Sequence, residues 1–288
     1  MSPRKPADTL RLWRPIQLPG VECLRAAYRC QHFARHSHRR YCVGVIEAGA
    51  LGFFYRGQNL VAPAGTVNFA NPDVPHTGQP AAPGGWTYRM FYLEPDVMTG
   101  AAAQMAGHAA AAPPFFPAGV MADTALARAI GGLHLALDSG RISRLDAETR
   151  LLDILAALIR RHSVAPPMLR PAGREPAAVN RVRRLIEDRC GENLSLADLS
   201  REAGLSPFHL IRVFQRHIGL TPHNYMTQQR IRRARALLAA GNPVADTALA
   251  VGFFDQSHLT HHFRRITGVT PGRYRKILQD DCAARPHI

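Results

Sequence analysis

The last third of the chain contains the same sequence unit twice, and this repeat is the strongest constraint on what the chain can fold into. Residues 197–225 read ADLSREAGLSPFHLIRVFQRHIGLTPHNY, and residues 245–274 read ADTALAVGFFDQSHLTHHFRRITGVTPGRY. Matching residues lie 48 positions apart at the start of the unit and, after a one-residue insertion, 49 positions apart to its end. A repeat of this length is one supersecondary structure used twice.

Each unit has the local signals of a helix-turn-helix. Ser195 can cap a first helix, with Asp198 three residues later in a variant of the capping box. Gly204 can end that helix in the left-handed conformation, and Ser206-Pro207 can begin a second helix. A short helix, a turn containing Gly and a steeply angled second helix make the motif that inserts its second helix into the major groove of DNA. We therefore predict helix-turn-helix units over residues 196–217 and 244–267.

The second helix of each unit supplies the candidate DNA contacts. We expect Leu210, Val213 and Phe214 to face the core, which leaves their neighbours facing outward. An outward Arg212 could pair with guanine O6 and N7 through its planar guanidinium. The predicted DNA-binding residues are Phe208, His209, Ile211, Arg212, Gln215 and Arg216 in the first unit, and Ser257, His258, Thr260, His261 and Arg264 in the second. Among the arginines, Arg216 and also Arg265 are expected to touch phosphates.

Charge favours DNA binding over a helix-turn-helix used only for packing. Residues 205–276 contain eleven Arg or Lys and two Asp, whereas a merely solvated surface usually mixes both signs. The net charge of +15 is spread over the whole chain, so only this local density is diagnostic.

A long helix is predicted between the two units, over residues 221–241. Apolar residues recur there at helical spacing: Tyr225, Ile231, Ala234, Leu237 and Leu238. A helix of about 18 residues is about 27 Å long. This is close to the roughly 34 Å between successive major-groove segments on one face of B-DNA. One chain could therefore read two adjacent segments.

These motifs resemble the AraC/XylS family of bacterial transcription regulators. The resemblance covers residues 177–276 and is strongest from Ala245 to Pro271. It implies a domain of seven helices in which Phe208, His209, Ile211 and Arg212 lie at or beside the bases. It implies the same for Ser257, Thr260 and His261. Many family members have Arg or Gln where His261 stands, which implies a smaller contribution from the second reading helix.

The N-terminal half is predicted to be a small β-barrel or jelly roll, because residues 21–93 contain several short strands separated by turns. CVGVI and LGFFY within Cys42–Tyr55 predict a hairpin around residues 47–50, with Glu47 solvated in its turn. Residues 86–93 alternate as a strand, and residues 122–138 and 144–162 are typical of helices. The stripe of the second helix would pack on the barrel or contact a second copy.

This half resembles the cupin-like effector domains that many AraC/XylS proteins have. We predict an α+β protein with a cupin-like effector and dimerisation domain at residues 10–162. A proline-rich linker at residues 163–176 would lead to the DNA-binding domain at residues 177–276, and the stretch 106–119 would be a loop.

A histidine pattern in this half has several possible roles. His36 and His38 lie two residues apart, which would place them on one face of a strand with Cys42, and His76 follows later. In metal cupins an HxH pair, a carboxylate and a later His bind the ion, and here Cys42 stands near the place of the carboxylate. A site of three His and one Cys would suit zinc or iron. The better supported interpretation is that these His lie at the barrel mouth and contact an effector or a neighbouring loop, so we assign no metal. The candidate effector-binding residues are His36, His38, His76, Trp86, Tyr88 and Arg89, the last of which could instead be exposed.

Composition excludes several other classes. The five Cys lie at 23, 30, 42, 190 and 282 without CxxC spacing, so we predict neither a disulfide framework nor a structural zinc site. No apolar stretch indicates a signal peptide or a membrane span, so a cytoplasmic location is expected. We assign no cofactor and no catalytic residue.

The sequence thus predicts a DNA-binding transcription regulator controlled by a small-molecule effector. The family resemblance adds activation through RNA polymerase and a homodimer. The alternative is a metal-dependent cupin enzyme fused to a DNA-binding module, for which the HxH pair is the only support. No pairing of a nucleophile with a base accompanies it.

Overall fold

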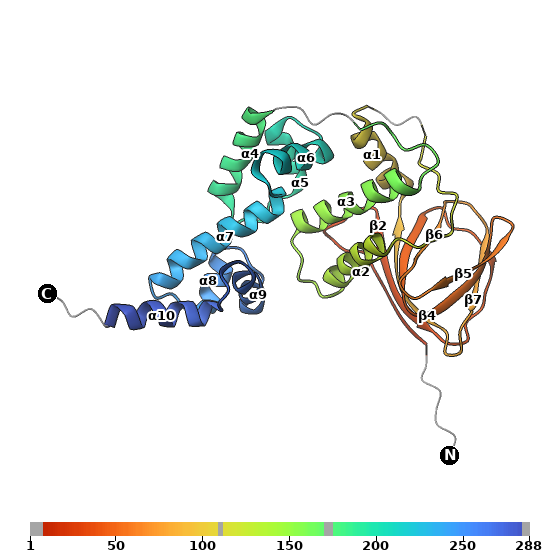
Figure 1. The fold of residues 1–288 in the computed structure, drawn as a ribbon, viewed down its shortest axis with the longest axis horizontal. Coiled ribbons are helices and arrows are strands. Elements are labelled where there is room, and N and C mark those ends of the chain that lie inside the picture. The colour runs from red at the N-terminus through yellow and green to blue at the C-terminus, as the bar shows by residue number, and fades with distance from the viewer. Residues whose placement is uncertain (1–7, 109–111, 170–174, 284–288) are drawn as a thin grey trace, which may run out of the picture. The chain divides into compact units, whose positions relative to one another are not determined.

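The computed structural model describes residues 8–108, 112–169 and 175–283, and the chain divides into two compact units (Figure 1). One unit is Met1–Ile142 with Arg150–Arg170, and the other is Ser143–Thr149 with Pro171–Ile288. The first is rich in strands and the second is helical, which confirms the predicted α+β class. Residues 170–174 of the predicted linker lie outside the described residues.

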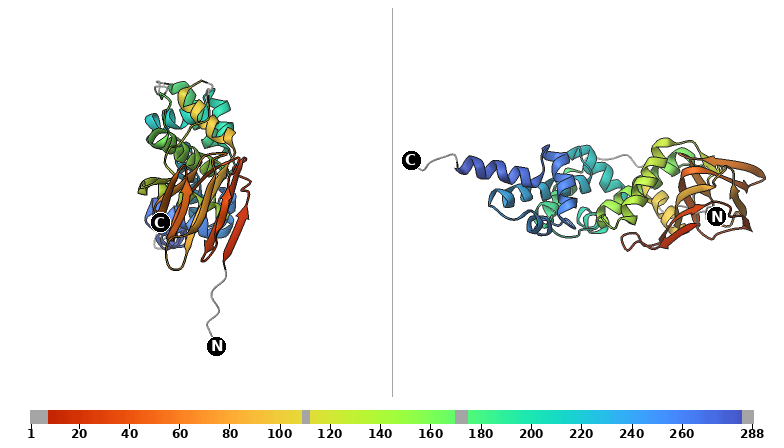
Figure 2. Two further views of the ribbon diagram at one scale, coloured as in Figure 1. Left: turned by 90° about the vertical axis from the view of Figure 1, so that its right-hand side faces the viewer. Right: turned by 90° about the horizontal axis from the view of Figure 1, so that it is seen from below.

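The first unit is a curled antiparallel sheet, seen from two further sides in Figure 2. Its main path of paired strands runs β1-β2-β8-β4-β6-β9, while β5 and β7 pair with β4, and β3 pairs with β7. The bounds are β1 Thr9–Trp13, β2 Val21–Tyr28, β3 Phe33–His36, β4 Tyr41–Tyr55, β5 Gln58–Pro63, β6 Val67–Ala70, β7 His76–Pro80, β8 Trp86–Leu93 and β9 Val120–Met121. The strand predicted at residues 86–93 is confirmed as β8.

Strand β4 corrects the predicted hairpin, because it runs unbroken for 15 residues. Its first half pairs with β6 and β8, and its second half pairs with β5 and β7. The register shifts between Ile46 and Ala48, which marks a β-bulge, and Gly49 has φ +70°. A Cβ at Gly49 would lie 2.0 Å from the carbonyl oxygen of Gly85. Gly49 therefore permits a bend in β4 instead of the expected turn. Because of this bend, the one strand belongs both to the layer with β6 and β8 and to the layer with β5 and β7.

Three helices accompany the barrel. The helices α2 (Thr124–Asp138) and α3 (Arg144–His162) agree with the sequence prediction, and α2 contacts β4, β6 and β8. The apolar stripe of α3 is buried and comprises Leu151, Leu152, Leu155, Leu158 and Ile159. The helix α1 (Pro95–Ala106) was not predicted, and its last residue falls in the expected loop. Its signals were Pro95 at the first helical position and a left-handed Gly107 after the end.

Asp123 connects the start of α2 to the end of α3. Its carboxylate accepts a hydrogen bond of 3.0 Å from the backbone N–H of Leu126, which caps α2. It also lies 3.0 Å from Arg161 Nη1 and 3.0 Å from His162 Nε2. The bond from His162, the backbone bond and then Arg161 hold the pKa of Asp123 well below its usual range. This carboxylate therefore stabilises the unit in its charged form.

The second unit contains seven helices among its described residues beyond position 175, as the family resemblance implied. They are α4 Pro176–Arg189, α5 Leu196–Ala203, α6 Pro207–Ile218, α7 Pro222–Ala239, α8 Val244–Ala250, α9 Gln256–Thr267 and α10 Pro271–Ala283. The predicted long helix is α7, with 18 residues. Ile231, Ala234 and Leu238 of α7 form a buried cluster with Leu259 and Phe263 of α9. None of the described helices has the length and apolar character needed to cross a membrane.

Arg230 is the charged side chain at the centre of this unit, and it is only 5% exposed. Its guanidinium donates hydrogen bonds to the carbonyl oxygens of Cys190 at 2.6 Å and Glu192 at 2.8 Å. Its Cζ also lies 5.8 Å from the ring centroid of Phe253. Burial lowers the pKa of Arg230 to about 10. This one residue of α7 thus joins the loop after α4 to the turn before α9.

We expect Asp123→Asn to remove a pH-dependent part of the stability of the barrel unit while leaving an oxygen that can still cap α2. The folded pKa of Asp123 is depressed, so its contribution is present above the ordinary pKa of about 3.9 and is lost as the pH falls below it. Asp123→Ala should cost about 1 kcal/mol more, because the cap is also lost. Urea unfolding followed by tryptophan fluorescence measures this, since both Trp residues, Trp13 and Trp86, lie in this unit. A difference between wild type and Asp123→Asn that persisted unchanged at pH 2.5 would contradict the assignment.

We expect Arg230→Ala to lower the free energy of unfolding of the helical unit by about 2–3 kcal/mol, because two carbonyls lose their donor and a cavity opens. Urea unfolding followed by circular dichroism at 222 nm should show the loss, while the tryptophan transition stays in place. Arg232→Ala, at an exposed position of the same helix, is the matched control and should change stability by less than about 0.5 kcal/mol. Equal effects of the two substitutions would show that Arg230 has no special role.

Candidate functional site

The first helix-turn-helix has the predicted caps. Ser195 and Asp198 form a reciprocal capping box at the start of α5, and Gly204 ends that helix with φ +68°. Ser206 then caps α6 through the backbone N–H of His209, and Gly219 ends α6 with φ +79°. Because each cap is local, the sequence alone was sufficient to place these helix ends.

The predicted outward face of α6 is wrong at three positions. Phe208 is 8% exposed, His209 is 3% exposed and Ile211 is 3% exposed. His209 Nε2 lies 2.8 Å from Oε1 of Glu175, at the start of α4. The physical reason is that α6 contacts α4, α5 and α7, so its buried face is wider than one helical stripe.

The C-terminal half of α6 keeps its accessible side chains. Gln215 and Arg216 are exposed, and Arg212 is half-buried. The guanidinium carbon of Arg212 lies 5.5 Å from the centroid of the Phe208 ring. The ring of Phe208 therefore stabilises the guanidinium of Arg212 by a cation–π contact.

Helix α9 presents a more open surface than α6. Ser257, His261 and Arg264 are exposed, and Thr260 is half-buried with its hydroxyl donating to the carbonyl of Gln256 at 2.7 Å. With Gln256, Arg265 and Thr270, these four side chains line a groove of about 600 Å³. Four of the five residues predicted to bind DNA in the second helix-turn-helix thus lie on one surface. This surface presents hydroxyls, an imidazole and guanidinium groups.

His258, the fifth residue predicted to bind DNA in the second helix-turn-helix, has a packing role. Its ring stacks against Phe254 at 5.2 Å and meets Phe253 edge-on at 5.1 Å between centroids. Burial lowers its pKa. The repeat placed His258 at the same position as His209, and the structure shows that both imidazoles are held by neighbouring side chains of the protein.

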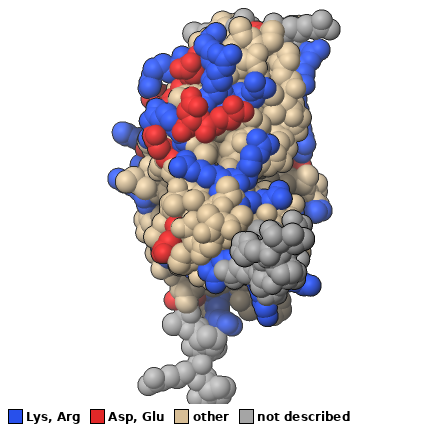
Figure 3. All heavy atoms as spheres, turned by 90° about the vertical axis from the view of Figure 1, so that its left-hand side faces the viewer, with Lys and Arg blue, Asp and Glu red and all other residues tan. Residues whose placement is uncertain are grey.

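Positive charge extends over the helical unit. In the face shown in Figure 3, Lys and Arg side chains are spread over most of its height, and the Asp and Glu side chains gather mainly in one area. A surface of this kind attracts a polyanion over several ångströms before any specific contact forms.

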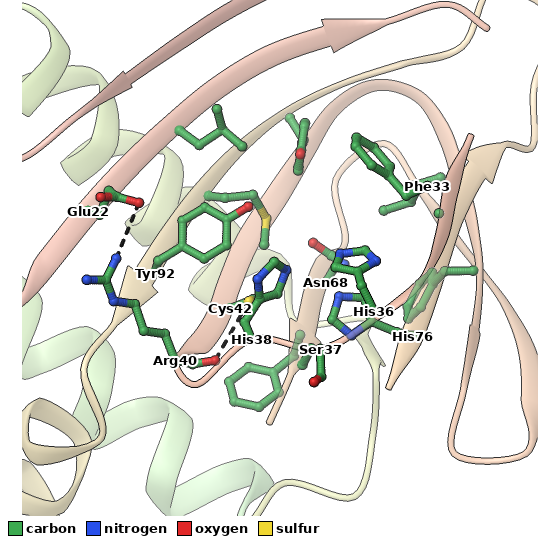
Figure 4. A pocket seen from close by; sticks show the side chains of 18 of the residues that line it. Glu22, Phe33, His36, Ser37, His38, Arg40, Cys42, Asn68, His76 and Tyr92 are labelled. Atoms are coloured by element: carbon green, nitrogen blue, oxygen red, sulfur yellow. Dashed lines mark hydrogen bonds and ion pairs between the residues drawn. The ribbon is translucent and has the colours of Figure 1, made fainter. Parts of the chain in front are cut away.

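The barrel unit contains a pocket of about 760 Å³ lined by residues of β1, β2, β3, β4, β6, β7 and β8 (Figure 4). Its lining is largely apolar and aromatic, with polar groups at one edge. Trp86 and Tyr88 line it as predicted, and Cys42 lines it in preference to Tyr41, whose hydroxyl donates to the carbonyl of Pro114 at 2.7 Å. Pockets of this size and character are typical of small-molecule sites.

Arg89 does not line this pocket, which corrects its prediction as an effector-binding residue. It is 5% exposed on the opposite face of β8, where it lies 2.6 Å from Glu47 and 3.3 Å from Asp138. Successive side chains of a strand point to opposite faces, so Tyr88 in the pocket requires Arg89 outside it. Glu47 is exposed, as expected, and its carboxylate is also paired with Arg89.

Sequence reasoning missed several residues of the pocket. Met90 and Tyr92 share the face of Tyr88, so the alternation of β8 could have identified them. Phe33 and Asn68 come from other strands, and no local pattern marks them. Among the described residues, Asn68 Oδ1 and Trp86 Nε1 are buried without a hydrogen-bond partner.

The three predicted histidines meet at the edge of the pocket (Figure 4). The expectation of an HxH pair on one strand is wrong, since β3 ends at His36 and His38 lies in the connection to β4. His36 and His76 are instead opposite each other in the β3–β7 pairing. The ring centroid of His38 lies 4.9 Å from that of His36 and 5.2 Å from that of His76.

Burial sets the protonation of this region. It lowers the pKa of His38 to about 4, with smaller contributions from His76 and His36, and it also lowers the pKa of His76. It raises the pKa of the Cys42 thiol to about 12. Near neutral pH His38, His76 and Cys42 are therefore uncharged, and Arg40, a cation on the lining, is paired with Glu22 and Glu94.

Comparisons with known proteins agree with this division into two sites. Residues 18–155 match the AraC-like ligand binding domain, and residues 199–277 match a helix-turn-helix domain. YbfI of Bacillus subtilis, an uncharacterized HTH-type transcriptional regulator, is 31% identical over 239 residues, which is 83% of this chain and 86% of that protein.

Other similarities cover about a third of the chain. The arabinose operon regulatory protein of Escherichia coli is 31% identical over 105 residues, which is 35% of this chain and 36% of that protein. The solved DNA-binding domain of AdpA, in complex with a target DNA, is 25% identical with a TM-score of 0.36, over 38% of this chain and 98% of that one. From the two domain matches and the relative that spans most of its length, the chain belongs to the AraC family of helix-turn-helix transcriptional regulators.

Proposed function

We propose that this regulator binds specific DNA sites through α6 and α9 and that a small molecule in the barrel pocket controls its activity. The observation that carries the proposal is the pairing of two distinct surfaces on one chain. One is the polar, arginine-containing groove of α9, together with the exposed Gln215 and Arg216 of α6. The other is the largely apolar pocket of the barrel.

The two reading helices contribute unequally. Of the predicted contacts on α6, only Arg212, Gln215 and Arg216 stay accessible, because Phe208, His209 and Ile211 are buried. On α9, Ser257, His261 and Arg264 are all exposed. The family resemblance implied a weaker second helix on the basis of His261. We propose instead that α9 makes the larger set of base contacts, with Arg264 as its main guanidinium group.

The barrel pocket suits an effector with an apolar body and few polar groups. Phe33, Trp86 and Tyr88 would pack on the apolar body of such a molecule. An effector changes DNA binding only if it binds two states of the protein with different affinity. We propose a cytoplasmic homodimer that acts as an activator by recruiting RNA polymerase.

The first experiment is selection of sheared genomic DNA by the purified full-length protein at about 0.15 M salt, where non-specific binding is weak. Recovery of a defined site with two contacted segments about one helical turn apart supports the proposal. Unselected DNA, both with and without extracts of small molecules from the cells, would refute sequence-specific reading.

We expect Arg264→Ala and Arg212→Ala each to weaken binding to the selected site by about 1–3 kcal/mol, with a smaller loss on scrambled DNA. Fluorescence anisotropy at fixed salt measures both affinities. Arg128→Ala, which removes one positive charge from α2 in the other unit, is the matched control and should leave both affinities unchanged. An equal loss on scrambled DNA would assign the residue to phosphate contact rather than base reading.

A further inference from the structure

His36, His38 and His76 bring three imidazoles to one point at the edge of the barrel pocket. Each ring offers a nitrogen, and these three nitrogens lie within 4.8 Å of one another. Two of the rings are fixed by the pairing of β3 with β7, and the third follows from the connection into β4. In Figure 4 the three rings lie together beside the aromatic lining.

Backbone carbonyls orient two of these rings. His36 Nδ1 lies 2.7 Å from the carbonyl oxygen of Ala34, and His76 Nδ1 lies 3.0 Å from that of Val74. A carbonyl can only accept, so Nδ1 carries the hydrogen in both rings and Nε2 keeps its lone pair. Metal-binding histidines are commonly held in this way, with the second ring nitrogen donating to a carbonyl.

The donor set of the cluster consists of three imidazole nitrogens. Within the described ranges, no Asp, Glu or Cys joins the group of donors. Three neutral nitrogen donors without a carboxylate favour a borderline-soft transition metal over Ca²⁺ or Mg²⁺.

We propose that His36, His38 and His76 bind one divalent transition metal ion, Zn²⁺ in the first instance, and that one coordination position stays open to the barrel pocket. Zinc–nitrogen bonds of about 2.0–2.1 Å place tetrahedral ligands about 3.4 Å apart, so small rotations of the rings complete the site. Three protein ligands leave the fourth position to water or to a bound molecule.

The open coordination position of the metal indicates which chemical class of effector would bind there. An anionic oxygen donor, such as a carboxylate, would bind the metal, while an aromatic or aliphatic body would pack on Phe33, Trp86 and Tyr88. This part of the inference rests on the proposed role of the pocket as the effector site, whereas metal binding itself does not. Cys42 also lines the pocket but lies outside the donor group, so it is not a ligand in this proposal.

Metal binding is tested on the full-length protein without an affinity tag, after dialysis against a chelator, by titration with Co²⁺ and with Zn²⁺. We expect one ion per chain, and for Co²⁺ visible absorption bands without the strong near-ultraviolet band of thiolate ligation. His38→Ala and His76→Gln should each weaken binding by about 100-fold. His32→Ala is the matched control, because this exposed ring bonds to the carbonyl of Cys30 outside the cluster.

Unfolding measurements give a second readout of metal binding and show whether each variant is folded. Zn²⁺ should raise the midpoint of the tryptophan-detected unfolding transition in wild type and in His32→Ala, but not in the two cluster variants. Tryptophan-detected unfolding without metal shows whether each variant is folded. No binding by wild type, or unchanged affinity in both folded cluster variants, would overturn the proposal.

Benzoate serves as the probe for the open position. A shift of the visible Co²⁺ bands when benzoate is added supports coordination of a carboxylate. Unchanged bands up to millimolar benzoate would overturn the proposal that the open position binds a carboxylate. None of these measurements involves DNA, so a failure here leaves the regulator proposal intact. Failure of the DNA selection would leave the metal site intact.

Discussion

The bend in β4 is the constraint on which the barrel and its pocket depend. One strand of 15 residues pairs with β6 and β8 before its bulge and with β5 and β7 after it, so the two layers share a single continuous backbone. The alternation of side chains then divides β8 into two faces. Tyr88 faces the pocket, while Arg89 faces Glu47 and Asp138.

A different constraint organises the helical unit, in which a buried cation replaces part of an apolar core. Arg230 on α7 satisfies two backbone carbonyls and lies beside the ring of Phe253, so the long helix is fixed to the segments on either side of it. The two helix-turn-helix copies within this unit differ at their surfaces. The first turn of α6 is buried against its neighbours, and α9 keeps an open groove.

Together these features describe a chain in which ligand chemistry and DNA reading are assigned to separate units. The pocket is lined by many aromatic and aliphatic groups, and its charged groups include Arg40, which is paired with Glu22 and Glu94. The helical unit has the opposite character, with guanidinium groups and hydroxyls at its surface.

The sequence by itself determined the features that local chemistry controls. The capping residues Ser195 and Ser206, the left-handed Gly204 and the alternation of residues 86–93 each act within a few residues, so the helix ends and β8 could be predicted. Only the tertiary structure decided which faces are covered. Packing of α6 against three helices buried Phe208 and Ile211, and the continuous β4 replaced the expected hairpin. The meeting of His36 with His76 depends on strand pairing across 40 residues, which no local pattern encodes.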